Sequence, residues 1–151
     1  MNDLFFKMVE LAQQGFLCSQ ILCLLALEEQ GKENPDLIRA MSGLIGGLGF
    51  CGKTCGALTG GACLIGLYAG KGSAEEMEDG HLNDMLKEFV KWFEQEEGAK
   101  YGGTDCNTIL ENNPVNRAAR CPQIVQAVYE KVMEILAANG YSASGEHNCR
   151  L

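Results

Sequence analysis

The sequence lacks several of the motifs on which common catalytic and cofactor-binding sites depend. Its only two histidines, His81 and His147, belong to no pattern that indicates a catalytic Ser/His/Asp or Cys/His site. No two of the eight cysteines have Cys-x-x-Cys spacing, which excludes a thioredoxin motif, a zinc knuckle and a covalent haem site. The glycines from Gly46 to Gly52 follow no predicted strand and lack a Gly-Lys-Ser/Thr ending, so they form no nucleotide phosphate loop.

Positive charge and long apolar runs are also scarce. The formal net charge of −8 argues against a nucleic-acid partner, because phosphate binding needs a basic face. The most apolar stretch, residues 44–67, is interrupted by Lys53 and by glycines, whereas a membrane span needs about 20 mainly apolar residues. The first ten residues show no signal-peptide pattern. We therefore expect no membrane insertion and a cytoplasmic location, where thiols stay reduced.

The apolar residues recur at helical spacing, and no alternating strand pattern is present, which predicts an all-α fold. Apolar residues make up 46% of the chain, enough for one core. We expect a single-domain bundle of about six helices over residues 1–140, followed by a mobile tail over residues 141–151. The predicted helices cover residues 3–14, 18–30, 35–48, 55–70, 74–97 and 122–139, with a short helix at 106–111. The 55–70 helix is apolar all round and rich in glycine, which places it at the centre.

Four cysteines lie at or near the predicted start of a helix, namely Cys18, Cys55, Cys106 and Cys121. Pro122 is expected to be the first residue of the last helix, which would put Cys121 at its N-cap. Free backbone N–H groups and the helix dipole favour a thiolate there, and such positions can lower a thiol pKa from ~8.5 to the range ~3.5–7.5. Lys53, Arg117 and Arg120 are close in sequence to these cysteines and would add to the effect.

The other four cysteines receive different expectations. Cys23 and Cys63 fall inside apolar helices, where cysteine behaves as a small buried hydrophobic residue. Cys51 lies four residues before Cys55, and an accessory role as a thiol or metal ligand stays open. Cys149 forms a His-x-Cys pair with His147 in the tail, which we expect to be disordered rather than a metal chelate.

The pattern of these cysteines resembles that of a known family. Its elements are the run Cys55-Gly56-Ala57-Leu58-Thr59-Gly60, a first cysteine in Gly15-Phe16-Leu17-Cys18, and two later cysteines, Cys106 after Tyr101-Gly102-Gly103, and Cys121. From about Gly15 to Ile135, the chain resembles the redox-active proteins named for the pattern C_GCAxxG_C_C. The family name spells Gly-Cys-Ala where this chain has Cys-Gly-Ala.

The resemblance implies redox activity that depends on cysteines. The family is also similar to part of the split-Soret cytochromes, in which an iron–sulfur cluster accompanies haem. This chain has no haem-attachment motif, so the resemblance leaves a cluster open without haem. Gly56 and Gly60 would let the backbone approach such a group and donate N–H groups to its sulfurs.

Three functions remain open. The first is a thiol redox protein, in which Cys18, Cys55, Cys106 and Cys121 cycle between dithiol and disulfide or transfer electrons. Its partner would be a redox protein or a small-molecule oxidant or reductant. The second is a protein in which the same four cysteines bind a [2Fe–2S] cluster or zinc. The third is a non-catalytic helical interaction module, and a homodimer stays open. We favour the first, on the hypothesis that these sulfurs meet in one pocket.

Overall fold

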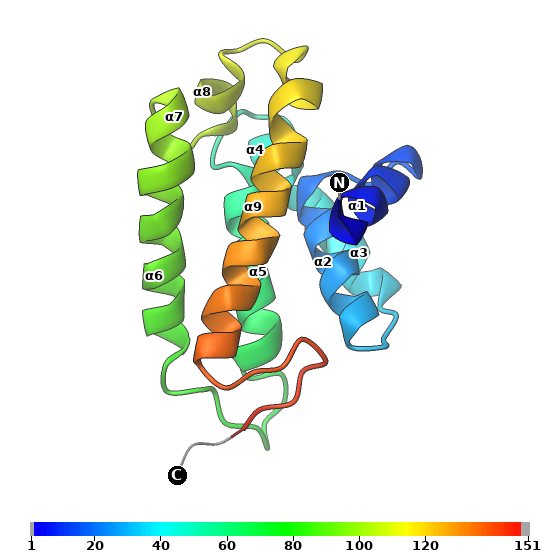
Figure 1. The fold of residues 1–151 in the computed structure, drawn as a ribbon, viewed down its shortest axis with the longest axis vertical. Helices are drawn as coiled ribbons and strands as arrows, with labels where there is room; N and C mark the ends of the chain where they lie inside the picture. Colours follow the sequence, from blue (N-terminus) through cyan, green and yellow to red (C-terminus); the bar gives the residue numbers. More distant parts are fainter. Residues whose placement is uncertain (1, 149–151) are drawn as a thin grey trace.

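The computed structural model describes residues 2–148. Almost all regular structure in this range is helical, and its only β-type pairings are two isolated bridges, which confirms the predicted all-α fold (Figure 1). No helix in the same range has both the length and the apolar composition needed to cross a membrane.

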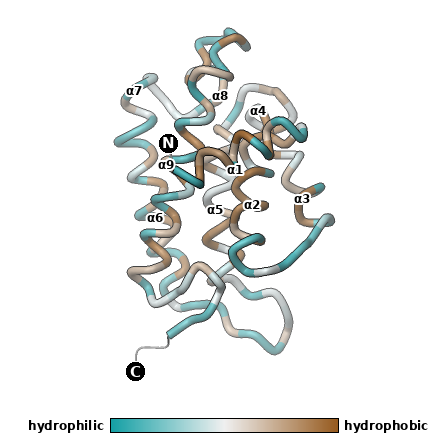
Figure 2. The backbone as a smooth tube through the Cα atoms, turned by 45° about the vertical axis from the view of Figure 1, so that its right-hand side comes forward, coloured by the Kyte–Doolittle hydropathy of each residue, from teal (hydrophilic) through white to brown (hydrophobic). Residues whose placement is uncertain are grey.

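The helices surround a central helix, α5 (Gly56–Ala69). On one side lie α1 (Asp3–Gln13), α2 (Cys18–Glu29) and α3 (Pro35–Met41), and on the other lie α6 (Leu82–Phe93) and α9 (Asn116–Ala138). Helix α5 packs against α2, α6 and α9, and its Leu64 and Ile65 are fully buried. The prediction of a central apolar helix is therefore confirmed. Figure 2 shows the apolar colour along much of α2, which covers α5 on one side.

Glycines allow neighbouring helices to pack closely on two faces of α5. A Cβ atom at Gly60 would lie 3.0 Å from the Cα atom of Ser19 in α2. At Gly61, it would lie 2.4 Å from the ring of Phe89 in α6 and 2.8 Å from Val128 in α9. The close backbone contact expected of this helix is therefore present on two sides, and its benefit offsets the low helix propensity of glycine.

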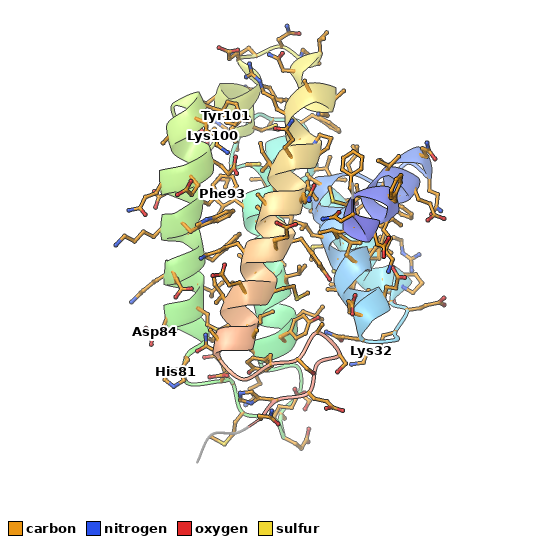
Figure 3. The ribbon with its side chains drawn as sticks, in the orientation of Figure 1. Lys32, His81, Asp84, Phe93, Lys100 and Tyr101 are labelled. Carbon is orange, nitrogen blue, oxygen red and sulfur yellow. The ribbon has the colours of Figure 1, made fainter. Side chains whose placement is uncertain are left out.

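The acidic helix is shifted along the chain relative to its prediction over 74–97. It begins at Leu82, and residues 74–81 form a loop in which Asp79 accepts a hydrogen bond from the Tyr141 hydroxyl at 2.6 Å. At its other end, it continues through the π-helical η2 (Glu94–Gly98) into α7 (Ala99–Tyr101). In Figure 3, His81 and Asp84 lie at its lower end, and Lys100 and Tyr101 lie at its upper end.

The helix predicted over 35–48 is also shorter than expected. It ends at Met41, and η1 (Ser42–Leu44) leads into the short element α4 (Ile45–Leu48). Residues 46–50, which we call the left-handed segment, all have positive φ angles of 62–70°. Leu48, the last apolar residue of the predicted helix, is 49% exposed, because this left-handed backbone turns its side chain outward.

The last helix begins earlier than predicted. Pro122 lies inside α9 rather than at its first position, so Cys121 is not an N-cap. Because proline has no N–H group, the Ala118 carbonyl lacks its usual donor four residues later. The short helix expected at 106–111 is confirmed as α8 (Cys106–Leu110).

Beyond α9, the chain folds back over residues 141–148. The N–H group of Asn148 donates to the Gly140 carbonyl at 2.8 Å, and the Tyr141 and His147 rings stack with their centres 4.0 Å apart. The mobility of this tail stays a prediction, and Cys149 lies outside the described residues.

Candidate functional site

The structure brings together the four cysteines that the sequence singles out. Cys18 opens α2, Cys55 precedes the first residue of α5, Cys106 opens α8, and Cys121 lies in the second turn of α9. All four line one cavity of about 50 Å³, whose other walls are mainly apolar. The helix ends that carry them meet in the upper half of the molecule in Figure 1. Segments far apart along the chain thus supply one cluster of thiols.

Two of these cysteines are held together by backbone pairing. The N–H group of Cys55 donates to the Thr104 carbonyl at 2.9 Å, and that of Cys106 donates to the Lys53 carbonyl at 2.6 Å. An isolated antiparallel bridge joins Thr54 to Asp105 between them. Cys55 and Cys106, which we call the inner pair, are both buried. This pairing fixes the start of α5 beside the start of α8.

Cys18 is fixed by close packing of α2 on α5. A Cβ atom at Gly56 would lie 2.6 Å from the Cys18 Sγ atom and 2.8 Å from the Leu44 carbonyl oxygen. Nearby, the buried Ser19 hydroxyl donates to the Met41 carbonyl at 2.8 Å, which ties the start of α2 to the end of α3. Only glycine at position 56 therefore leaves room for the sulfur of Cys18 at the cavity.

The left-handed segment forms part of the cavity wall through Gly46. The backbone N–H group of Gly46 lowers the pKa of the Cys18 thiol. A Cβ atom at Gly46 would lie 2.4 Å from the Phe50 ring, and one at Gly47 would lie 2.4 Å from the Lys53 carbonyl oxygen. The other members of the segment include Leu48 and Phe50, for which a left-handed backbone costs about 1–2 kcal/mol per residue. Strain of this kind is characteristic of sites whose geometry the surrounding structure imposes.

Burial raises the pKa of three cavity thiols, contrary to the expectation from their positions in the sequence. Desolvation raises the pKa of Cys55 to about 12 and that of Cys121 to about 11, and it also raises the pKa of Cys18. Backbone N–H groups of Ala57 and Leu58 at Cys55 act in the opposite direction without overcoming burial. For Cys18, Cys55 and Cys121 the expected lowering is therefore wrong, because an apolar cavity disfavours the charged form more than the nearby N–H groups favour it.

Arg117 is the only charged residue in the cavity lining. Its positive charge lowers the pKa of Cys18 and of Cys121 against the effect of burial. No carboxylate within residues 2–148 lies at ion-pair distance from its guanidinium. Arg117 thus supplies an unpaired cation beside two thiols.

The other two cations near these cysteines in sequence have different positions. Arg120 is engaged elsewhere: it pairs with Glu111 at 2.8 Å, donates to the Ile109 carbonyl and lies 5.1 Å from the centre of the Tyr101 ring. Lys53 is exposed and does not line the cavity. Of Lys53, Arg117 and Arg120, only Arg117 therefore lines the cavity with the thiols.

A larger groove of about 430 Å³ reaches two of the cysteines from outside. It runs between α1 and the first half of α9, and Cys18 and Cys121 line both this groove and the cavity. We call Cys18 and Cys121 the outer pair. The sequence does not predict this groove, because no local pattern indicates that α1 and α9 lie side by side.

The other three cysteines within residues 2–148 do not line the cavity. Cys23 is buried and Cys63 half-buried on the facing helices α2 and α5, consistent with the expectation that they pack as small hydrophobic residues. Cys51 is exposed just after the left-handed segment and does not line the cavity. Gly60, expected near a bound group, packs on Ser19 instead and is not part of the cavity lining, whereas Gly56 is.

Histidine takes no part in this site. His81 lies at the start of α6 and is exposed, with its Nδ1 atom 3.8 Å from Asp84 (Figure 3). His147 belongs to the C-terminal turn beside Tyr141. Among residues 2–148, no three side chains of His, Cys, Asp or Glu are grouped so as to hold one metal ion.

Comparisons with known proteins identify one match. A family model described as "Putative redox-active protein (C_GCAxxG_C_C)" matches residues 16–135. This range contains all four cavity cysteines and Arg117. No curated protein and no solved structure matches the chain.

Proposed function

The chain belongs to the redox-active C_GCAxxG_C_C family, and on that premise we propose that its cavity cysteines carry out thiol–disulfide exchange. One observation supports this function above the others: four thiols line one cavity of about 50 Å³, and two of them also face a groove open to solvent. The arrangement offers an entry point for a reactant and further thiols behind it. A homodimer and a cytoplasmic location remain predictions.

The proposed reaction transfers two electrons to a disulfide of a partner protein or small molecule. A thiolate of the outer pair attacks one sulfur of that disulfide, which forms a mixed disulfide and releases the other sulfur as a thiolate. A second cavity cysteine loses its proton and attacks the mixed disulfide. The products are one disulfide within the cavity and two thiols on the acceptor.

Cys18 is the best-supported attacking residue. It lines the groove, and the backbone N–H groups of Ser19 and Gly46 lower its pKa against the effect of burial. The charge of Arg117 further stabilises its thiolate. Cys121, which lines the same groove and cavity, is the first choice for the resolving cysteine, with the inner pair behind it.

Disulfide mapping tests this proposal directly. The reduced, metal-free protein is treated with glutathione disulfide, free thiols are blocked, and the disulfides are located by mass spectrometry. We expect one disulfide within the cavity in the wild-type protein and in the control variant Cys51→Ser. The variant Cys18→Ser should form it much more slowly. A disulfide outside the four cysteines, or wild-type behaviour of Cys18→Ser, would overturn the proposal.

A [2Fe–2S] cluster is the second candidate, favoured by the convergence of four thiols from four segments. Each iron of such a cluster needs two cysteine sulfurs, so the four sulfurs need not surround one point. Cys18, Cys55, Cys106 and Cys121 would hold it, and the N–H groups at Cys18 and Cys55 would help set its reduction potential. The cluster would supply one-electron transfer. A single zinc ion is less well supported, because no three ligands within residues 2–148 are grouped for it.

Anaerobic purification separates the two candidates. A colourless protein without acid-labile sulfide, before and after incubation with iron and sulfide, supports thiol–disulfide exchange. A brown protein that loses its colour in Cys18→Ser and keeps it in Cys51→Ser supports the cluster. Visible absorbance and acid-labile sulfide content, measured on the same preparation, show whether a cluster is bound.

A further inference from the structure

The groove beside the outer pair has the size and walls of a small-molecule site. Its volume of about 430 Å³ falls in the usual range of ligand pockets, about 300–1,000 Å³. Its walls are mainly apolar, with Met8 and Val9 from α1 facing Val125 from α9. The shape and composition therefore suit a compact apolar molecule better than the flat surface of a folded protein.

The polar groups of this groove are few and lie together. Cys18, Cys121 and Arg117 are all in its lining, and Arg117 is the only charged residue there within residues 2–148. The Arg117 guanidinium is partly buried and has no carboxylate partner in that range. A guanidinium without a carboxylate partner in an apolar groove favours a carboxylate ligand, which it can bind through two parallel hydrogen bonds.

We propose that this groove binds a small organic disulfide that carries an apolar chain and one carboxylate. The apolar chain would contact the α1 and α9 walls, the carboxylate would pair with Arg117, and the disulfide would meet the outer pair. This inference rests on the proposed thiol–disulfide exchange and specifies its substrate class. The sulfur of Cys18 would attack the ligand disulfide. Closure of the cavity disulfide would then release the second ligand sulfur, and the two protons of the cysteines pass to the two ligand sulfurs. Two cysteine thiols are thus oxidised to a disulfide as the ligand disulfide is reduced to two thiol groups, which belong to one dithiol where the ligand disulfide is cyclic.

Binding is tested first with ligands that cannot react. Octanoate and its neutral amide share an apolar chain and differ in charge. For the reduced protein, calorimetry should show octanoate binding about tenfold more tightly than octanamide, the size of effect expected for one charge-assisted hydrogen bond. Arg117→Gln should remove this preference, Arg117→Lys should keep most of it, and Arg39→Gln, at an exposed arginine outside the groove, should leave it unchanged.

The groove walls are tested with a matched pair of valines. Val9 lines the groove and Val90 lies on α6, and both are 37% exposed. Val9→Asp should weaken octanoate binding about tenfold or more, because it places a negative charge beside the chain and the carboxylate. Val90→Asp should bind as the wild type does. Equal affinities of the two variants would overturn the assignment of the ligand to this groove.

The reaction is tested with lipoate, a cyclic disulfide on an aliphatic carboxylate, and with lipoamide, its neutral amide. At low ligand concentration, the reduced protein should reduce lipoate several times faster than lipoamide, and Arg117→Gln should lose this difference. If glutathione disulfide closes the cavity disulfide but lipoate shows no advantage or octanoate does not bind, this inference is wrong and the proposed function stands. If neither disulfide oxidises the cavity cysteines, the proposed function itself fails.

Discussion

The guanidinium of Arg117 lies 4.9 Å from the centre of the Phe50 ring, so a cation on α9 packs against the exposed end of the left-handed segment. This contact links the two walls of the cavity that come from α4 and α9. A cation over an aromatic face at a partly exposed site contributes about 0.5–1 kcal/mol. The contact therefore holds Arg117 beside the outer pair without neutralising its charge.

Removing the charge of Arg117 should lower the reactivity of the outer pair. In Arg117→Gln, the pKa of Cys18 and of Cys121 should rise, because the positive charge that lowers both is lost. When a thiol pKa increases by one, the fraction of thiolate at any pH well below that pKa decreases about tenfold. Alkylation by iodoacetamide at pH 8, followed residue by residue with mass spectrometry, should slow at these two cysteines.

Two comparisons make this result specific. Arg117→Lys keeps a positive charge and should retain much of the wild-type rate. Cys51 is exposed and outside the cavity, so its alkylation should be the same in all variants. An unchanged rate at both outer cysteines in Arg117→Gln would show that the guanidinium does not act on them.

The glycines of α5 offer a test of the packing around Cys18. In Gly56→Ala, the new methyl group would lie 2.6 Å from the Cys18 Sγ atom and 2.8 Å from the Leu44 carbonyl oxygen. We expect a loss of about 1–3 kcal/mol in the free energy of unfolding, the usual cost of overpacking. Gly66→Ala in the same helix meets open space and should stabilise by up to about 1 kcal/mol. Urea unfolding measures both, and the same sign for the two variants would contradict the structure.

The left-handed segment should be stabilised by a residue that its backbone favours. Leu48 has a φ angle of 66° and is 49% exposed, so Leu48→Gly removes little packing and relieves the steric cost. We expect a gain of about 1 kcal/mol in stability. Lys87→Gly, at an exposed position inside α6, should instead lose about 1 kcal/mol. A loss of stability in Leu48→Gly would show that its left-handed conformation is not strained.

Much of the fold could be predicted because local signals agreed with tertiary packing. Asn34 caps α3 by accepting a hydrogen bond from the Leu37 N–H group at 3.1 Å, and Pro35 follows at the first helical position, a combination typical of a helix start. The apolar, glycine-rich composition of α5 indicated a central helix, and its neighbours do pack on two faces. The predicted helix starts at Cys18, Cys55 and Cys106 also agree with the structure.

The errors arose where local signals were ambiguous. Leu44 and Leu48 continue the spacing of α3, but the backbone becomes left-handed at Gly46, and spacing alone does not indicate handedness. Pro122 is compatible with the first turn of a helix or with a position inside it, and the contacts of α9 select the second. The pKa shifts of the cavity thiols depend on burial, and this burial results from the packing of four distant segments, which local sequence patterns do not indicate.

The raised thiol pKa values predict that the reduced protein loses stability in alkaline solution. An unfolded cysteine ionises near its ordinary pKa of 9.0, whereas Cys55 in the folded protein ionises near 12 and Cys121 near 11. Between pH 9 and the pKa of each folded thiol, the unfolded chain binds fewer protons than the folded one, so the free energy of unfolding falls as pH rises. The stabilising contribution of the two thiols is fully present below pH 9 and is lost as pH rises through about 11 and about 12.

Replacing Cys55 isolates this effect from other alkaline transitions, including that of Tyr129, whose pKa is also raised by burial. In Cys55→Ala, the decrease in unfolding free energy between pH 9 and 11 should be shallower by up to about 1.4 kcal/mol per pH unit, the value for one proton. Cys51→Ala removes an exposed thiol and should keep the wild-type slope. Urea unfolding under a reductant at several pH values gives the three slopes. Equal slopes would mean that the Cys55 thiol ionises at the same pH in the folded and unfolded chains, and that its cavity is open to water.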